Sequence, residues 1–244
     1  MPARIGLIIP ASNRMVEQEM VRHVPPGVVA HVMRLRMTGE HRGAIDALLP
    51  RVTDAASHLL DARCDVVAFH CTANSTSEGL AGEAKLLGAL GSAGAALATT
   101  TATAVRHAFE TLGARRIVLI TPYTQHTTEE EAGFLREAGY DVPLARGFGL
   151  NGSDEYCATP PQFWRDRAIE AARPEADAYF LSCANISVFP VIAEIEATLG
   201  RPVVTSNQAV IWDALRLLGI GERNCPGRLF DSLGAGSAAR RVHA

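Results

Sequence analysis

Two stretches of this chain repeat one pattern at a fixed distance. Residues 65–75 (DVVAFHCTANS) have an acidic start, an apolar middle and a cysteine followed by small polar residues, and residues 177–187 (DAYFLSCANIS) follow the same plan. Residues 4–10 (RIGLIIP) and 116–122 (RIVLITP) match at five of seven positions. Both pairs are 112 residues apart (183 − 71 and 116 − 4). Because two independent segments share one offset, the sequence predicts an internal duplication.

The duplicated stretches are predicted to be buried parallel strands that end in polar loops. Short, uniformly apolar runs closed by small polar residues are typical of strands covered on both faces. Segments of helical periodicity alternate with such strands along the chain, which predicts parallel sheets joined by right-handed crossovers. We therefore expect an α/β protein with one α/β domain at residues 1–112 and a similar one at 113–230. Residues 231–244, rich in Gly, Ala, Ser and Arg, are expected to form a mobile C-terminal tail.

The composition argues against several classes of function. A net charge of −3 supplies no basic field for nucleic acid or a membrane surface. No apolar run approaches the roughly 18 residues of a membrane span, and the N-terminus leads into a strand without a secretory signal. Five widely spaced cysteines, with no Cys-x-x-Cys pair, indicate neither a disulfide framework nor a metal site. A reducing, cytoplasmic setting fits this pattern.

Cys71 and Cys183 end the two duplicated strands and are the candidate reactive residues. A single buried cysteine is a common core residue, but two at duplicated positions favour a shared functional site. Strand ends of this kind hold the chemistry of open α/β sheets. Helices that begin beyond each loop are expected to lower the thiol pKa and to attract a carboxylate. The remaining cysteines are interpreted as structural: Cys64, Cys157 and Cys225.

Two further loops contain candidate residues. Tyr123 follows the proline that ends the strand at 116–122, and Asn13 lies in the equivalent loop of the first copy. Two interpretations explain Tyr123 equally well at this point. It could simply pack in the core, or its phenol could donate a hydrogen bond to a carboxylate. Residues 147–152 (GFGLNG) match G-x-G-x-x-G, but the preceding strand is weak and no acid follows about 20 residues later, so a dinucleotide site is not expected.

The segments together resemble the aspartate/glutamate racemase superfamily, and within it the branch of maleate cis–trans isomerases and arylmalonate decarboxylases. The resemblance covers about residues 4–230. It implies two similar α/β domains related by a pseudo-twofold axis, a site between them that needs no cofactor or metal, and a homo-oligomer. The segments that carry it are RIGLIIPASN (4–13), CT (71–72), ITPY (120–123), SCAN (182–185), PVVTSNQAVIWDAL (202–215) and GRLF (227–230).

The resemblance also implies roles for individual residues. Cys71 and Cys183 match the two catalytic cysteines of the isomerases and racemases. The decarboxylases have glycine at the position of Cys71 and a glycine pair after their single cysteine, whereas Ala-Asn follows Cys183 here. The implied substrate-binding residues are Asn13, Thr72, Tyr123, Asn151, Ala184 and Asn185.

The hypothesis that follows is an enzyme that isomerises a small unsaturated dicarboxylate, of the maleate-to-fumarate type, with two cysteines. Two alternatives stay open at this point. One keeps the two thiols as proton carriers on opposite faces of a chiral carbon and makes the protein a racemase of an amino acid or another α-substituted carboxylic acid. The other is a non-catalytic protein that binds small carboxylates.

Overall fold

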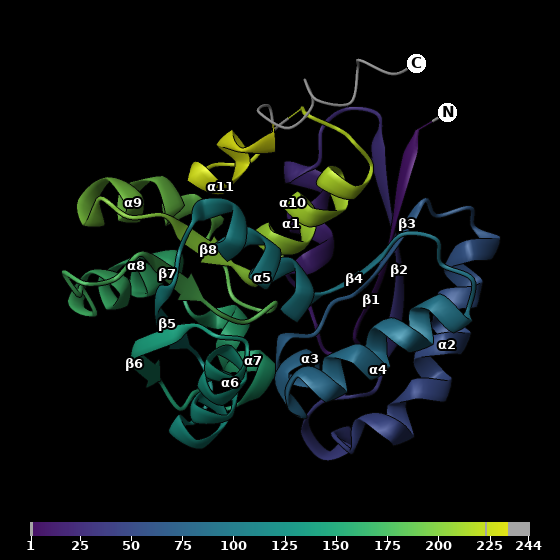
Figure 1. Cartoon of the computed structure of the whole chain (residues 1–244), viewed down its shortest axis with the longest axis horizontal. Helices are drawn as coiled ribbons and strands as arrows, with labels where there is room; N and C mark the ends of the chain where they lie inside the picture. The colour runs from purple at the N-terminus through teal and green to yellow at the C-terminus, as the bar shows by residue number, and fades with distance from the viewer. Residues whose placement is uncertain (1, 223, 234–244) are drawn as a thin grey trace.

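The chain forms two four-stranded parallel sheets, one from each half of the sequence (Figure 1). The computed structural model describes residues 2–222 and 224–233. The first sheet has the order β2 (Val28–Leu35), β1 (Ala3–Pro10), β3 (Val66–Phe69) and β4 (Ala98–Thr100). The second has the order β6 (Asp141–Gly147), β5 (Arg116–Thr121), β7 (Ala178–Leu181) and β8 (Val203–Thr205).

The pairing register of the two sheets repeats the sequence offset residue by residue. Ile5 of β1 lies opposite Val66 of β3, and Ile117 of β5 lies opposite Ala178 of β7. Each member of the second pair follows its counterpart by 112 residues (117 − 5 and 178 − 66). The expected α/β fold with two similar parallel sheets is confirmed.

Helices connect successive strands and cover both sheets (Figure 1). The first half contains α1 (Val16–His23), η1 (a 3-10 turn, Gly39–His41), α2 (Ile45–Asp61), α3 (Thr72–Thr76), α4 (Gly79–Ser92) and α5 (Thr101–Leu112). The second half contains α6 (Gln125–Glu137), α7 (Gly152–Ala158), α8 (Pro161–Glu170), η2 (a 3-10 turn, Phe189–Val191), α9 (Ile192–Leu199), α10 (Ser206–Leu217) and α11 (Arg228–Asp231).

Equivalent threonines begin α5 and α10, the two helices that join the halves. Thr100 and Thr205 each end the last strand of a sheet and cap the next helix by accepting a hydrogen bond from its third N–H group. Such a cap satisfies one of the N–H groups that a helix start leaves without a partner. The local sequence at the end of β4 and of β8 therefore turns the chain at once into a helix.

The two halves share one hydrophobic core. The helices α5 and α10 pack against each other and each contacts both β4 and β8, and Figure 1 shows them between the two sheets. The largest buried cluster combines Ile5 and Phe109 from the first half with Phe180 and Trp212 from the second. The boundary expected between residues 112 and 113 thus separates the two repeats in sequence, but the hydrophobic core contains residues from both repeats.

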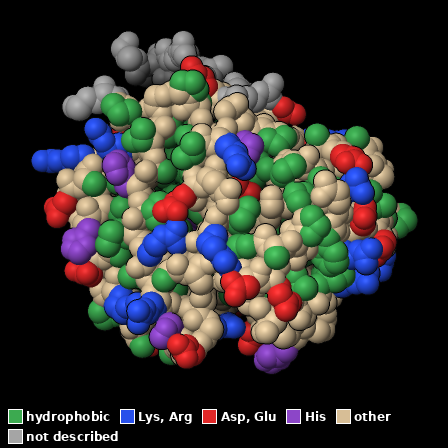
Figure 2. All heavy atoms as spheres, turned by 180° about the vertical axis from the view of Figure 1, so that it is seen from behind, with side chains coloured by type: hydrophobic (Ala, Val, Ile, Leu, Met, Phe, Trp, Pro, Cys, Tyr) green, Lys and Arg blue, Asp and Glu red, His purple; other side chains and the backbone are tan. Residues whose placement is uncertain are grey.

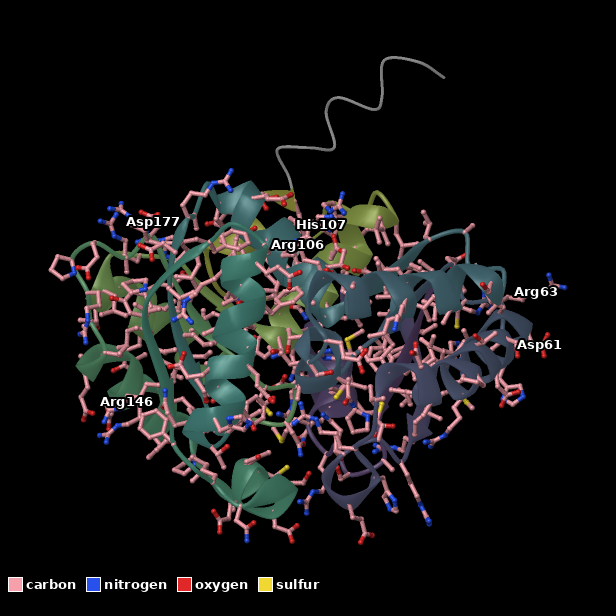
Figure 3. The ribbon with its side chains drawn as sticks, turned by 60° about the horizontal axis from the view of Figure 1, so that its bottom comes forward. Asp61, Arg63, Arg106, His107, Arg146 and Asp177 are labelled. Atoms are coloured by element: carbon pink, nitrogen blue, oxygen red, sulfur yellow. The ribbon has the colours of Figure 1, made fainter. Side chains whose placement is uncertain are left out.

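A buried acid fastens α10 to the first half. Asp213 is fully buried, accepts a hydrogen bond from Thr99 Oγ1 at 2.7 Å and has its Oδ1 3.1 Å from His107 Nδ1. Figure 3 shows His107, with its neighbour Arg106, where the two halves meet. A buried carboxylate requires such partners, so this cluster contributes to the fixed docking of the two sheets.

Three segments differ from the sequence expectation. The loop after Cys71 is the short helix α3, and α7 is an additional helix before α8. Asp231, the first residue of the expected tail, ends α11, and Leu233 is buried. Residues 234–244 of the expected tail lie outside the described residues.

The surface agrees with the modest net charge. None of the helices in the described part of the chain has the length and apolar character that spanning a bilayer requires. Figure 2 shows basic and acidic side chains interspersed over the face that it displays.

Candidate active site

A cavity of about 1150 Å³ opens where the carboxyl ends of the two sheets meet. Its wall includes Cys71 from the end of β3 and Cys183 from the equivalent end of β7. The structure brings all the residues singled out in the sequence to this one cavity: Asn13, Cys71, Thr72, Tyr123, Asn151, Cys183, Ala184 and Asn185.

The sheet hydrogen bonding stops directly before each cysteine. His70 N donates to Ile8 O and Ser182 N donates to Ile120 O, each at 2.8 Å, which continues the ladder one residue beyond β3 and β7. The next residue then leaves the sheet and turns toward the cavity. Both halves therefore deliver a thiol at the equivalent point of the sheet.

The backbone at Cys183 is strained, whereas that at Cys71 is not. Cys183 has φ = 148°, a region that L-residues rarely adopt, and Cys71 has an ordinary extended φ of −147°. Two hydrogen bonds hold Cys183: its N–H donates to Ser206 Oγ at 3.1 Å, and Asn185 N donates to its Sγ at 3.3 Å. Strain of this kind costs on the order of 1–3 kcal/mol and persists only where surrounding contacts impose it.

Both thiols are held in the protonated form. Burial raises the pKa of the Cys71 thiol to about 11 and that of Cys183 to about 12. The backbone N–H of Asn74, in the first turn of α3, lowers the pKa of Cys71 as expected of a helix start, but burial outweighs it, so the expected net lowering is wrong.

Different groups surround the two thiols. Asn74 Nδ2 donates to Cys71 Sγ at 3.3 Å, and this contact together with the charge of Arg42 lowers the pKa of Cys71 against the effect of burial. Around Cys183 a hydrogen bond with Tyr123 lowers the pKa, while the nearby Cys71 and Glu131 raise it. The two thiols are thus close enough to influence each other, and the charged group nearest in effect is a cation, Arg42, at Cys71 and a carboxyl group, Glu131, at Cys183.

Tyr123 faces both thiols from the end of β5. Burial raises the pKa of its phenol well above the usual value, and the neighbouring Cys183, Glu131 and Cys71 act in the same direction. The phenol therefore stays protonated and able to donate a hydrogen bond. Its loop fits closely against Gly147, where a Cβ atom would lie 2.6 Å from Tyr123 O.

Asn13 and Asn185 join the loops of the two halves. Asn13 Nδ2 donates to Ala184 O at 2.8 Å, while its Oδ1 accepts from the N–H groups of Met15 and Val16 at the start of α1. Asn185 Oδ1 accepts from Arg14 N at 2.9 Å. An amide nitrogen carries two hydrogens, so Asn13 keeps one donor beyond its bond to Ala184.

The other two predicted binding residues differ in exposure. Thr72 is buried and donates its hydroxyl to Ser206 Oγ at 2.8 Å. As the first residue of α3 it also has a backbone N–H group without an intrahelical partner. Asn151 is exposed at the rim, where its N–H donates to Glu155 Oε2 at 2.7 Å.

Two buried glutamates lie at duplicated positions, 19 and 131 (131 − 19 = 112), and sequence reasoning missed them. Glu131 Oε1 accepts a hydrogen bond from Ser182 Oγ, the residue before Cys183, at 2.5 Å. Glu19 accepts from Asn207 Nδ2, whose Oδ1 lies 2.8 Å from His70 Nε2. Each glutamate thus connects, directly or through Asn207, to the residue that precedes a candidate cysteine. The constant offset of 112 was the signal that could have identified them.

Tyr156 is a second phenol that the sequence did not indicate. It lies in α7, lines the cavity and packs edge-on against Tyr123 with ring centroids 5.9 Å apart. Burial raises its pKa to about 12, with a further contribution from Cys183. No duplicated counterpart or motif marks this position.

Over residues 2–222 and 224–233 no three His, Cys, Asp or Glu side chains are grouped as a metal site would require.

Comparison with known proteins gives a consistent assignment. The arylmalonate decarboxylase family matches residues 5–230. The chain is 34% identical to arylmalonate decarboxylase from Bordetella bronchiseptica, over 93% of this chain and 96% of that protein. It is 27% identical to maleate isomerase from Geobacillus stearothermophilus, over 89% and 92%.

A solved structure has the same fold. It is a serine-for-cysteine variant of maleate cis–trans isomerase from Nocardia farcinica with a covalently bound succinylcysteine intermediate. The TM-score is 0.83 at 24% identity, and the match covers 94% of this chain and 98% of that one.

Glycine should be tolerated better than alanine at position 183. Because φ is 148° there, we expect Cys183→Gly to be more stable than Cys183→Ala by about 1 kcal/mol or more. At position 71, where φ is −147°, the order should reverse, with Cys71→Ala more stable by about 0.5–1 kcal/mol. Urea unfolding of the four variants measures both differences. The same order at both positions would contradict a strained backbone at Cys183.

The buried glutamates should make the protein less stable as pH rises. Burial raises the pKa of Glu19 to about 8 and of Glu131 to about 7, from 4.5. A pKa raised on folding gives stability that is complete below the unfolded value and is lost as pH rises through the folded value. His70, whose pKa burial lowers from 6.5 to about 4, is neutral in the folded state above pH 6.5 and loses its remaining unfolded-state charge as pH rises further, equally in the native protein and in the glutamate variants.

The window between pH 6.5 and 8 therefore reports on the glutamates. We expect the urea midpoint to fall across this window in the native protein and to fall less in Glu19→Gln and in Glu131→Gln. An equal fall in all three proteins would mean that these carboxyl groups ionise freely in the folded state.

Proposed function

Because the chain belongs to the arylmalonate decarboxylase family, we propose that it is an enzyme that acts on a small carboxylate without a cofactor, and that its reaction is cis–trans isomerisation of an unsaturated dicarboxylate of the maleate type. The observation that carries the proposal is the pair of thiols, Cys71 and Cys183, which line one cavity from equivalent strand ends. The thiols reach a bound molecule from different halves, so one can form a bond to it while the other handles a proton.

The surroundings of the two thiols support different roles for them. Cys71 has Asn74 and the charge of Arg42 beside it, and both favour the thiolate. At Cys183 burial raises the pKa to about 12; hydrogen bonds from Tyr123 and Asn185 act against burial, but Cys71 and Glu131 nearby favour the thiol. We therefore assign Cys71 as the nucleophile and Cys183 as the proton donor.

The reaction begins when the Cys71 thiol loses its proton to water and the resulting thiolate forms a C–S bond to one carbon of the double bond. The π electron pair moves to the adjacent carbon and its carboxylate, and Cys183 gives its proton to that carbon. Rotation about the new single bond follows. Cys183 then removes a proton, the electron pair of that C–H bond re-forms the double bond, the C–S bond breaks with its electron pair returning to Cys71, and the trans product leaves. The intermediate is a succinyl thioether, the species named in the Nocardia farcinica isomerase structure.

The charge that develops on the substrate carboxylate needs hydrogen-bond donors held in place beforehand. Tyr123 supplies a phenol that burial keeps protonated. Asn13 has one amide hydrogen beyond its bond to Ala184 O, and Thr72 supplies the first N–H group of α3. These groups are proposed to hold the carboxylates, with Asn151, Ala184 and Asn185 completing the wall.

Decarboxylation of a substituted malonate is the second candidate, because the match to the Bordetella enzyme has 34% identity. That reaction would need a single thiol to protonate the carbanion left by loss of CO₂, and Cys183 with Tyr123 could serve. It would leave Cys71 without a role. The presence of a second thiol in the cavity therefore favours isomerisation.

Loss of either cavity thiol should abolish most of the activity. With maleate as substrate, Cys71→Ala and Cys183→Ala should each lower kcat by at least about 10²-fold, the low end for a positioned acid, base or nucleophile. Cys183→Ala should also accumulate protein with the added mass of one substrate on Cys71, detected by mass spectrometry. Cys225→Ala is the matched control, because Cys225 lies outside this cavity, and it should keep the native rate. Near-native turnover by Cys71→Ala would exclude the mechanism.

Proton NMR in deuterated water distinguishes the candidate reactions. We expect maleate to convert to fumarate, phenylmalonate to remain unchanged, and the α-proton of chiral amino and hydroxy acids not to exchange. Loss of CO₂ from phenylmalonate would instead indicate the decarboxylase, and α-proton exchange would indicate a racemase. If no substrate reacts while maleate still protects both thiols from alkylation, the protein is a carboxylate-binding protein.

A further inference from the structure

Two equivalent loops at the mouth of the cavity carry opposite charges at the same repeat position. We call residues 38–42, which follow β2, the first strap, and residues 150–154, which follow β6, the second strap. Both straps line the cavity. Arg42 of the first strap and Asp154 of the second are 112 residues apart (154 − 42), so the duplication places a cation and an anion at corresponding points of the rim.

Each charged residue forms an ion pair with the opposite half. Arg42 NH2 lies 3.4 Å from Glu130 Oε2 in α6, and Asp154 Oδ1 lies 2.6 Å from Arg14 NH2 in the loop before α1. Arg42 and Asp154 are related by the repeat, but their partners are not, because Glu130 corresponds to Gln18 and Arg14 to His126. At this one repeat position the cavity mouth therefore has a cation on one side and an anion on the other.

Arg42 is the least engaged of the three arginines that line the cavity. Arg34 donates to Asn13 O at 2.7 Å and pairs with Glu17 at 2.5 Å, and Arg14 has its close contact with Asp154. The partner of Arg42 is farther away at 3.4 Å.

The partner of Arg42 is also shared and partly exposed. The Glu130 side chain is 40% exposed, and its other oxygen lies 3.5 Å from His126 Nε2. Partly exposed ion pairs of this kind contribute little. A carboxylate inside the cavity can therefore replace Glu130 at Arg42.

We propose that Arg42 is the specificity-determining residue of this site, and that it binds the second carboxylate of a dianionic substrate. The inference rests on the proposed function and deepens it by assigning the recognition of the second charge. A guanidinium can hold a carboxylate through two parallel N–H groups. The corresponding residue of the second strap is an anion, Asp154, paired with Arg14, so it offers no equivalent site for a carboxylate and the substrate binds in one orientation. The other charged groups near Arg42 are Glu40 and His41 in its own strap and Glu130 and His126 in α6.

The first test measures the field at Cys71 without turnover. Iodoacetate and iodoacetamide both alkylate a thiolate with loss of iodide, but only iodoacetate is an anion. The ratio of their rates at Cys71, followed by peptide mass spectrometry, reports the attraction of an anion to this part of the cavity. Removing Arg42 also lowers the fraction of Cys71 that is thiolate. This change slows alkylation by both reagents by the same factor, so it does not alter the ratio of their rates.

We expect Arg42→Gln to lower the iodoacetate-to-iodoacetamide ratio at least about threefold. Arg42→Lys keeps the charge and should keep most of the ratio, and Glu130→Gln should raise it by releasing Arg42. Arg63→Gln is the matched control, because Arg63 is exposed and lies at the outer end of the first half in Figure 3. An unchanged ratio in Arg42→Gln would overturn the proposal whatever the enzyme's reaction is.

The second test uses affinity. Arg42→Gln should weaken protection of Cys71 by maleate at least about tenfold, the effect of losing one charged hydrogen-bonded partner, and should leave protection by the monoanion crotonate nearly unchanged. Equal weakening for both ligands would assign Arg42 a structural role instead. Protection measures binding alone, so failure of maleate to isomerise would refute the proposed reaction without affecting this result.

Discussion

The carbonyl oxygen of Ala184 connects the two halves of the chain beside the cavity. It accepts a hydrogen bond from Asn13 of the first half at 2.8 Å and from Asn207 of α10 at 3.3 Å. Asn207 also connects to His70 and Glu19, so one buried network fixes the loop of Cys183 against the end of β3. Buried polar groups that lose a partner are costly, and this cost prevents the halves from sliding apart. The relative position of the two thiols depends on this network.

Duplication explains why the scaffold is symmetric, and departures from it explain why the site is not. The strands, their register and the position of each cysteine repeat at one offset. Several residues around the thiols do not repeat: His70 corresponds to Ser182, and Arg42 corresponds to Asp154. A symmetric pair of thiols would have no preferred direction of addition. The non-equivalent neighbours give each thiol a different electrostatic environment and so allow different roles.

The sequence predicted the strands because their apolar pattern is local. It predicted that the two cysteines meet in one cavity because the constant offset places them at equivalent strand ends of two similar halves. It did not predict the properties that depend on the tertiary environment. The positive φ of Cys183 depends on Ser206, which is distant in sequence. The pKa of Cys71 moved opposite to expectation because burial is a property of the assembled core. The burial of Glu131 depends on the packing of α6 against Ser182, which is distant in sequence.

Burial of both thiols has a consequence for the charge that the cavity can hold. A dianionic substrate beside a Cys71 thiolate brings negative charge into a site where burial already disfavours the charged form of every thiol and phenol. Coulomb repulsion grows as water is excluded, so compensation must come from groups at the cavity wall. Tyr123 and the first N–H group of α3 provide dipoles, but only a cation can balance a full charge. Arg42, on the Cys71 side and loosely paired with Glu130, is placed to supply that balance only once the substrate has entered.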